Sequence, residues 1–187
     1  MIYEQPYLET DRLILKHGSY EDYVKVYEYD FTRLRNIAGE FEFVKLDPKV
    51  LEGYENDCYK NERMIDLILY LKDSNIPIGN IVLDRYDIKN DSLEVSVNIH
   101  PKYWRLGYMT EAVIKILDYA FNELMISNVV YSYAKDNFKS KGLSEKIGFE
   151  IVGTYTEFHK RIRKNIECNK TMMNKEKYKD LYGNKII

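Results

Sequence analysis

The spacing of apolar residues changes several times along the chain, and each spacing predicts a different kind of element. Apolar and polar residues alternate strictly over 92–100, which is typical of a strand with one buried face, with apolar residues at Leu93, Val95, Val97 and Ile99. From Met109 to Leu124 the apolar residues recur at steps of three and four, so they line one side of a helix. The sequence therefore predicts a strand, a short connection around Gly107 and then the clearest helix of the chain.

The same periods, and the turn residues between them, predict the remaining elements. Ser19 and Asp22 have the spacing of a capping box at the start of a helix. Pro48 suits the first turn of another helix that runs to about Lys60, whereas 31–43 is ambiguous between a short helix and a loop. Further elements are a helix over 137–147 and strands over 8–16, 64–72, 78–87, 128–134, 149–160 and 166–173.

The order of these elements is strand, helices, three strands, helix, strand, helix and two strands. A strand, a helix and a second strand in direct succession, over 92–134, imply a parallel pair in a sheet otherwise built from hairpins. We therefore expect an α+β (mixed α/β) fold. No repeat, low-complexity tract or Pro/Gly/Ser-rich linker divides the 187 residues, so we expect a single domain over 1–187.

Charge and cysteine content argue against several classes of function. The chain has 28 Lys and Arg against 30 Asp and Glu, a net charge of −2, which does not support a general nucleic-acid binder. Cys58 and Cys168 are too few for a disulfide framework or a zinc site, so we interpret them as buried or idle thiols. The short apolar run near the N-terminus has charges on both sides, and no later run is long enough to span a bilayer. We expect a cytoplasmic protein without nucleic-acid or membrane partners.

The connection Tyr103–Thr110, with the sequence YWRLGYMT, admits two interpretations. Gly107 either turns a strand into a helix or shapes a loop whose backbone N–H groups hold an anion. A helix N-terminus offers unpaired N–H groups and the positive end of the helix dipole, which suit a phosphate or diphosphate, and Arg105 adds a cation. The loop lacks the Lys-Ser/Thr pair of a Walker motif and the three glycines of a Rossmann fingerprint. From the loop alone, both interpretations remain open.

The residues around this loop also carry a family resemblance. The run Glu94–Val113, EVSVNIHPKYWRLGYMTEAV, resembles the acyl-CoA-binding segment of GNAT N-acetyltransferases. It is most similar to the branch of the ribosomal-protein N-terminal acetyltransferases (RimJ/RimL-like). Other segments agree in the order of that branch, namely LETDRLILK at 8–16, N-x-x-S-x-x-L with EKIGF at 137–149, and GTYTEFHK at 153–160. The resemblance extends from about Leu8 to Tyr178.

The resemblance implies a GNAT-like fold and a place for acetyl-CoA. The implied fold is a twisted, mixed, seven-stranded sheet, flanked by helices and splayed between its fourth and fifth strands. The pantetheine arm would lie in that gap, and the loop of Gly107 would be the diphosphate cradle. The residues implied to bind acetyl-CoA, in the loop through backbone N–H groups, are Ile99, Arg105, Leu106, Gly107, Tyr108, Met109, Thr110, Asn137 and Ser140.

The chain departs from the family pattern at Arg105 and Leu106, where the family cradle usually has a glycine and a basic residue, and at two further positions that affect coenzyme binding. Met109 stands where the family has a small residue, but its side chain falls on the apolar helix face, so we expect it in the core. Gly142 stands where the branch often has an arginine. The distal phosphate of the coenzyme would then depend on Lys139 or Lys141, unless both are solvated surface lysines.

Moving an acetyl group from a thioester to an amine requires a base, donors to the oxyanion and stabilisation of the departing thiolate. The resemblance implies the backbone N–H near Ile99 as the donor and Ser140 as the group beside the thiolate. Alternatively, Ser140 makes a local backbone hydrogen bond in its helix. The candidate bases are Glu94, at the splay, and Glu157, on the closing hairpin, and either could instead be an exposed strand carboxylate. The three histidines are scattered, so neither a metal site nor a covalent acyl-enzyme is indicated.

Together these features indicate transfer of an acetyl group from acetyl-CoA directly to a primary amine, through a ternary complex. The acceptor stays open among a protein N-terminus, a polyamine, an aminoglycoside and another small amine. A partly acidic stretch suits a cationic acceptor, although ordinary surface charge explains it equally well; its residues are Glu40, Glu42, Asp47 and Glu52. The alternative is a non-catalytic acyl-CoA-binding or sensing module that kept the cradle and lost turnover. Dimerisation through the closing hairpin is common in the branch, so the resemblance also allows a homodimer.

Overall fold

The structure is a computed structural model, and it describes residues 4–28, 64–159 and 163–183. The helix expected after Pro48, the ambiguous stretch 31–43 and the partly acidic stretch from Glu40 to Glu52 lie outside the described residues. Within the described ranges, no helix is long and apolar enough to cross a bilayer.

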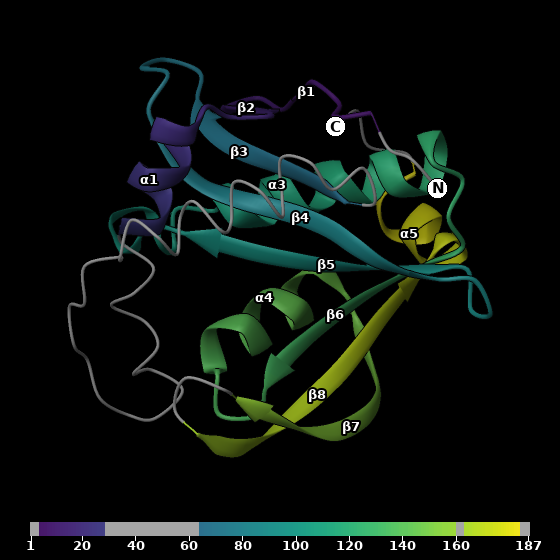
Figure 1. The fold of residues 1–187 in the computed structure, drawn as a ribbon. Coiled ribbons are helices and arrows are strands. Elements are labelled where there is room, and N and C mark those ends of the chain that lie inside the picture. Colours follow the sequence, from purple (N-terminus) through teal and green to yellow (C-terminus); the bar gives the residue numbers. More distant parts are fainter. Residues whose placement is uncertain (1–3, 29–63, 160–162, 184–187) are drawn as a thin grey trace.

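One sheet organises the described part of the chain (Figure 1). Its strands are β1 (Leu8–Glu9), β2 (Leu13–Lys16), β3 (Ile65–Leu71), β4 (Pro77–Asp87), β5 (Ser92–Ile99), β6 (Asn128–Ala134), β7 (Glu150–His159) and β8 (Lys164–Asn174). Their order across the sheet is β1-β2-β3-β4-β5-β6-β8-β7. Every neighbouring pair is antiparallel except β5 and β6, which are parallel as predicted. The mixed α/β fold class is confirmed.

The sheet has eight strands rather than the expected seven, because the first expected strand is interrupted. Thr10 turns the chain: its backbone N–H donates to the carbonyl oxygen of Leu13 at 3.0 Å, and its hydroxyl accepts from the N–H of Leu13 at 3.0 Å. β1 and β2 consequently pair as a small antiparallel hairpin around Asp11 and Arg12. The alternation that suggested one long strand belongs to β2, where Leu13 and Leu15 are fully buried.

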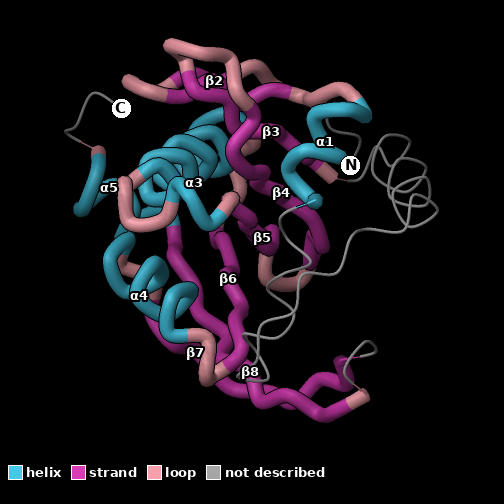
Figure 2. The backbone as a smooth tube through the Cα atoms, turned by 90° about the vertical axis from the view of Figure 1, so that its left-hand side faces the viewer, coloured by secondary structure: helices cyan, strands magenta, loops and turns pink. Residues whose placement is uncertain are grey.

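Helices lie on both faces of the sheet (Figure 2). One face carries α3 (Tyr108–Asp118), α4 (Phe138–Ile147) and α5 (Lys175–Tyr182), and the other carries α1 (Tyr20–Glu28). A 3₁₀ turn, η2 (Pro101–Tyr103), precedes α3, and a π-helical turn, η3 (Tyr119–Glu123), continues it, so the helix expected over 109–124 is α3 and η3 together. α5 was not predicted, because Tyr178 is its one buried residue and leaves no apolar stripe in the sequence.

The capping box expected at the start of α1 is present. The backbone N–H of Ser19 donates to a carboxylate oxygen of Asp22, and the N–H of Asp22 donates to the Ser19 hydroxyl, both at 3.3 Å. The Asp22 carboxylate also accepts the hydroxyl hydrogen of Tyr70 at 2.8 Å, which joins α1 to β3. A local cap therefore also fixes where α1 lies on the sheet.

The main core lies between the sheet and α3. α3 contributes its predicted apolar face, with buried residues Met109, Ala112, Val113, Ile116 and Leu117. β5 contributes Leu93, Val95 and Ile99 to the same core. Because side chains alternate along a strand, Glu94, Ser96 and Asn98 belong to the opposite face of the sheet, which carries α1.

Gly142 offers a test of how α4 is packed. It lies in the middle of that helix, where glycine costs about 1 kcal/mol relative to alanine. A Cβ atom at Gly142 would have no other atom within 4 Å. We expect Gly142→Ala to raise the free energy of unfolding by about 1 kcal/mol and the thermal midpoint by roughly 2–4 °C in calorimetry. Gly148, which ends α4 with φ of 98°, is the matched control: Gly148→Ala should lower the midpoint. A fall in the thermal midpoint for Gly142→Ala would contradict the finding that position 142 of the helix has room for a side chain.

Candidate active site

β5 and β6 are paired only at their N-terminal ends. The partners in register are Ser92 with Asn128, Leu93 with Val129 and Glu94 with Val130. Beyond Glu94 the two strands diverge, whereas β6 stays paired with β8 along its whole length (Figure 1). The splay expected between the fourth and fifth predicted strands is therefore confirmed between β5 and β6, and Glu94 lies at its vertex.

The loop after β5 reaches α3 through two residues in the left-handed region. Arg105 has φ of 62° and Gly107 has φ of 86°, and Gly107 is the N-cap of α3. Glycine adopts this conformation without the steric cost that a side chain imposes. Trp104 anchors the loop to β5, because its indole N–H donates to the carbonyl oxygen of Ile99 at 2.9 Å. Gly107 is thus required for the turn. Whether the loop also suits an anion depends on the N–H groups that follow Gly107.

The start of α3 presents backbone donors that have no acceptor in the described part of the chain. No described residue accepts a hydrogen bond from the N–H of Tyr108, Met109 or Thr110, and no side chain caps the helix. The first bond of the helix runs from the N–H of Glu111 to the carbonyl oxygen of Gly107 at 3.0 Å. Such donors at the positive end of a helix dipole attract anions. The side chain of Met109 is in the core, with 8% exposed, as predicted.

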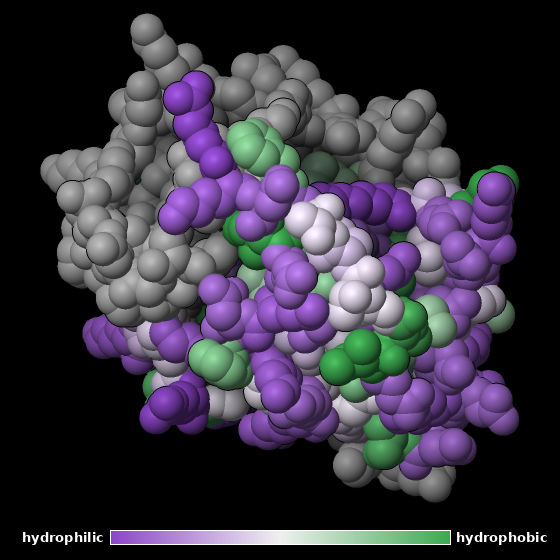
Figure 3. All heavy atoms as spheres, turned by 90° about the horizontal axis from the view of Figure 1, so that it is seen from below, coloured by the Kyte–Doolittle hydropathy of each residue, from purple (hydrophilic) through white to green (hydrophobic). Residues whose placement is uncertain are grey.

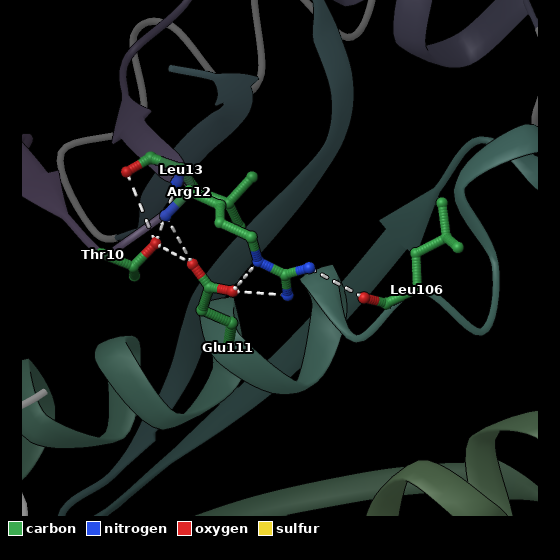
Figure 4. Close-up of polar contacts among 5 residues, drawn as sticks. All are labelled: Thr10, Arg12, Leu13, Leu106 and Glu111. Carbon is green, nitrogen blue, oxygen red and sulfur yellow. Dashed lines mark hydrogen bonds and ion pairs between the residues drawn. The ribbon is translucent and has the colours of Figure 1, made fainter. Parts of the chain in front are cut away.

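The carboxylate of Glu111 ties the start of α3 to the turn between β1 and β2 (Figure 4). Its Oε1 accepts from the Thr10 hydroxyl and, at 2.9 Å, from the backbone N–H of Arg12. Its Oε2 accepts from Nε of Arg12 at 2.7 Å and forms an ion pair with Nη2 of the same guanidinium at 2.6 Å. The remaining nitrogen of the guanidinium, Nη1, donates to the carbonyl oxygen of Leu106 at 3.0 Å. Thr10, Arg12 and Glu111 are hereafter called the clamp.

The environment of the clamp favours an ionised Glu111. Burial alone would raise the pKa of Glu111, but the hydrogen bonds from Thr10 and Arg12 outweigh it and hold the pKa below its ordinary value of 4.5. The Arg12 guanidinium also lies over the Tyr108 ring, 4.4 Å from its centroid. In the sequence the three residues occur in the motifs LETDRLILK and MTEAV, but no local spacing reveals a contact across 99 residues. The clamp was therefore not predicted.

α4 begins beyond the end of β6, on the side where the strands have diverged, and its first turn holds two of the expected coenzyme ligands. Asn137 is the N-cap, and its Oδ1 accepts the backbone N–H of Ser140 at 3.1 Å. The local hydrogen bond considered for Ser140 is thus made by its backbone. The Asn137 amide NH₂ and the Ser140 hydroxyl have no hydrogen bond to a described residue. Ser144 is buried instead, with its hydroxyl 3.2 Å from that of Thr171.

A cation–π contact connects α4 with the loop after β5. The Nζ atom of Lys139 lies 3.5 Å from the centroid of the Trp104 ring. Trp104 follows β5 and Lys139 follows β6, so the contact spans the open end of the splay. Lys141 lies 3.8 Å from the carboxylate of Glu145, one turn further along α4. Of the two lysines considered for a phosphate contact, Lys139 is the one beside the loop.

Glu94 belongs to a charged group on the face of the sheet that carries α1. Arg85 Nη1 donates to Oε2 of Glu94 at 2.9 Å, and Asp84 is opposite Glu94 in the β4–β5 register. Burial raises the pKa of Asp84; Arg85 opposes this rise and Glu94 adds to it. Oδ1 of Asp84 is buried and accepts no hydrogen bond from the described residues. The sequence offered no signal for Asp84 or Arg85, because their positions depend on the register shift in β4 that follows Asp84.

Glu157 lies on β7 and is exposed to solvent. Its negative charge acts on Tyr155, which the charge of Glu94 also affects. Tyr155, two residues earlier, is opposite Cys168 in the β7–β8 register. Burial raises the pKa of Tyr155, a hydrogen bond with Ser132 lowers it, and the negative charges of Glu157 and Glu94 are among the influences that raise it further. Both expected carboxylates therefore lie close enough to influence one tyrosine that the sequence did not single out.

Known proteins share both the sequence and the architecture. The sequence profile of the acetyltransferase (GNAT) domain matches residues 12–150. An uncharacterized N-acetyltransferase of Schizosaccharomyces pombe is 30% identical over 172 residues, covering 85% of this chain and 92% of that protein. A GNAT-family acetyltransferase from Bacillus anthracis has a similar crystal structure, with a TM-score of 0.75, 21% identity and 91% and 99% of the two chains covered. The microcin C7 self-immunity acetyltransferase, solved with acetyl-CoA and AMP, gives a TM-score of 0.70 at 17% identity over 88% and 93%.

The clamp should make the stability of the protein depend on acid pH. Because the pKa of Glu111 in the folded protein is below 4.5, its ionised form contributes stability that is complete above pH 4.5 and is lost as the pH falls through the folded value. We expect the thermal midpoint to fall between about pH 6 and about pH 3, and to fall less for Glu111→Gln, which does not titrate. Glu145→Gln, at a carboxylate whose side chain is 63% exposed, should keep the full decrease. Equal decreases for the two variants would contradict this role of Glu111.

Proposed function

Since the chain belongs to the GNAT acetyltransferase family, we propose that it moves the acetyl group of acetyl-CoA directly to a primary amine in a ternary complex. The observation that carries the proposal is the row of backbone donors at the start of α3 that have no acceptor among the described residues, next to the splay of β5 and β6. Acetyl-CoA has an anionic diphosphate and an extended arm, which suit these two features. We further propose that residues 1–187 form one domain, that it works in the cytoplasm and that it belongs to the RimJ/RimL-like branch, whose motifs occur in order.

The diphosphate would be held by backbone N–H groups of the segment Arg105–Thr110, with Lys139 at the rim. The N–H of His100 donates to the carbonyl oxygen of Ile78 in β4 at 2.8 Å. Because N–H groups of successive strand residues point to opposite edges, the N–H of Ile99 faces the gap and is the donor we assign to the thioester carbonyl. Asn137 uses its Oδ1 as a cap, which leaves its NH₂ group to hold the pantetheine arm.

For the chemistry, we assign the Ser140 hydroxyl to the departing thiolate and a carboxylate on the face of α1 to the amine proton. Glu94, at the vertex of the splay, is the first candidate, and Glu157 on β7 is the second. The ion pair with Arg85, at 2.9 Å, holds the carboxylate of Glu94 in place. Asp84 lies opposite Glu94 in the β4–β5 register and burial raises its pKa, so it becomes a third candidate base.

The acceptor is a primary amine, and a protein N-terminus, a polyamine and an aminoglycoside are all consistent with the proposal. The carboxylates of Asp84, Glu94 and Glu157 would attract a cationic amine, and Arg85 forms ion pairs with the first two of them. A screen of a short N-terminal peptide, spermidine and an aminoglycoside, with detection of the released thiol, separates these classes.

We expect acetyl-CoA to stabilise the folded protein. At about a hundredfold over Kd it should add about 2.7 kcal/mol, which corresponds to a rise of roughly 5–10 °C in the thermal midpoint. CoA should act similarly, and ATP should not. Trp104, the single tryptophan, lies in the cradle loop, so its fluorescence gives the Kd independently.

Gly107→Ala is the matched variant for this titration. The added Cβ would lie 3.3 Å from Nη2 of Arg12, at φ of 86°, so the loop would be strained and the stabilisation by acetyl-CoA should largely disappear. If acetyl-CoA shifts the midpoint of the unmutated protein no more than ATP does, the proposed function is wrong.

Removal of the catalytic base should lower kcat by about 10²–10⁴-fold and leave the Kd of acetyl-CoA unchanged. The variants Glu94→Gln, Glu157→Gln and Asp84→Asn, assayed over pH with the best acceptor of the screen, identify the base. Glu145→Gln, on the other face, is the control and should keep its activity. Full activity in all three variants would exclude a carboxylate base, and binding without turnover on any amine would favour the non-catalytic sensing module.

The edge strand β7 supports the proposal of a homodimer through the closing hairpin. Among the described strands β7 pairs with β8 alone, and it carries the exposed apolar residues Ile151, Val152 and Phe158. Seen from the end of the molecule where β7 and β8 lie, hydrophobic side chains form several separate patches on a mostly hydrophilic surface (Figure 3). An unpaired strand edge with apolar side chains favours pairing with a second chain. Light scattering distinguishes one chain from two per particle.

A further inference from the structure

The guanidinium of Arg12 makes contacts with two separate parts of the cradle at once. Its Nη1 donates to the carbonyl oxygen of Leu106 at 3.0 Å, while Nε and Nη2 contact Oε2 of Glu111 at 2.7 and 2.6 Å. Leu106 precedes Gly107 in the loop, and Glu111 lies in the first turn of α3 (Figure 4). Arg12 therefore fixes the loop relative to the helix that follows it.

The contact with Leu106 also determines the direction of a backbone donor. In a planar trans peptide the C=O and the N–H of the next residue point in opposite directions. Because the carbonyl of Leu106 points to Arg12, the N–H of Gly107 points away from Arg12. No described residue accepts a hydrogen bond from the N–H of Gly107, which lies next to the donors of Tyr108–Thr110. The bond from Arg12 thus adds one more oriented donor to the row at the start of α3.

The same ion pair reduces a charge conflict near the diphosphate. The carboxylate of Glu111, in the first turn of α3, is favourable for the helix dipole but would repel a bound anion. Arg12 pairs with that carboxylate and is held in place by the backbone contact to Glu111 and by the ring of Tyr108, 4.4 Å away. A planar fork with several N–H groups can bind a carboxylate and a carbonyl together, and a lysine ammonium cannot do so in the same geometry.

We propose that Arg12 is a positioning residue for the coenzyme diphosphate: through Leu106 and Glu111 it orients the N–H of Gly107 toward the phosphate oxygens. The inference rests on the proposed function, because it explains how the loop proposed to bind the diphosphate is held in position. Arg12 acts through the backbone of the loop, so its effect should be confined to ligands that carry the diphosphate.

The test compares acetyl-CoA with S-acetylpantetheine, which has the same thioester and arm but no phosphate. The Kd of each ligand is measured by calorimetry or, for the weaker ligand, by ligand-observed NMR, in Arg12→Met, Arg12→Lys and the unmutated protein. Arg12→Met should weaken acetyl-CoA about tenfold or more, which corresponds to about 1.4 kcal/mol, and change S-acetylpantetheine less than twofold. Arg12→Lys should lie between, since it keeps the charge but not both contacts.

Lys72→Met is the matched control. Lys72 pairs with Glu9 at 2.7 Å beside the same β1–β2 hairpin, and its backbone N–H donates to the carbonyl oxygen of Arg12, so its side chain can be removed without touching the cradle. It should leave both Kd values unchanged. Equal weakening of the two ligands in Arg12→Met and Arg12→Lys, or no weakening, would overturn this inference alone. Failure of the unmutated protein to bind acetyl-CoA would overturn the proposed function and the inference with it.

Discussion

The geometry of the candidate site depends on one carboxylate, that of Glu111. It accepts hydrogen bonds from Thr10 and Arg12, and so holds the β1–β2 turn against the start of α3 across 99 residues of sequence. Through Arg12 the same contact extends to Leu106 and to the loop that presents the backbone donors. Charge-assisted bonds in a half-buried position are stronger than exposed ion pairs. They hold a loop whose Arg105 and Gly107 are both left-handed.

A second constraint is the alternation of side chains along β5, which separates two kinds of surface. Leu93, Val95 and Ile99 pack against α3, while Glu94 belongs to the face that carries Asp84 and α1. β5 and β6 are paired only as far as Glu94, so this carboxylate lies where the two strands part. A loop with backbone donors after β5 and carboxylates at this point are the arrangement that the proposed transfer between two substrates would need.

Motifs and periodicity predicted a good part of this site. The strand ending at Ile99, the loop with Gly107 and the helix after it were all placed correctly, since each has a strong local pattern. Asn137 was predicted only as a ligand of the coenzyme, and its second role as the N-cap of α4 was missed. Asp84 and Tyr155 were missed, because burial and neighbours from other strands, not the residues beside them, make them distinctive.

The sequence by itself determined the order of the elements from β3 to β8, the apolar face of α3 and the family resemblance, because periodicity and motifs are properties of neighbouring residues. Only the tertiary structure decided that Thr10 breaks the first strand, that Arg12 meets Glu111 and that Lys139 meets Trp104. These contacts join residues far apart in the chain, and their partners are chosen by where the sheet brings them. A pattern among neighbouring residues does not specify contacts between residues so far apart in the chain.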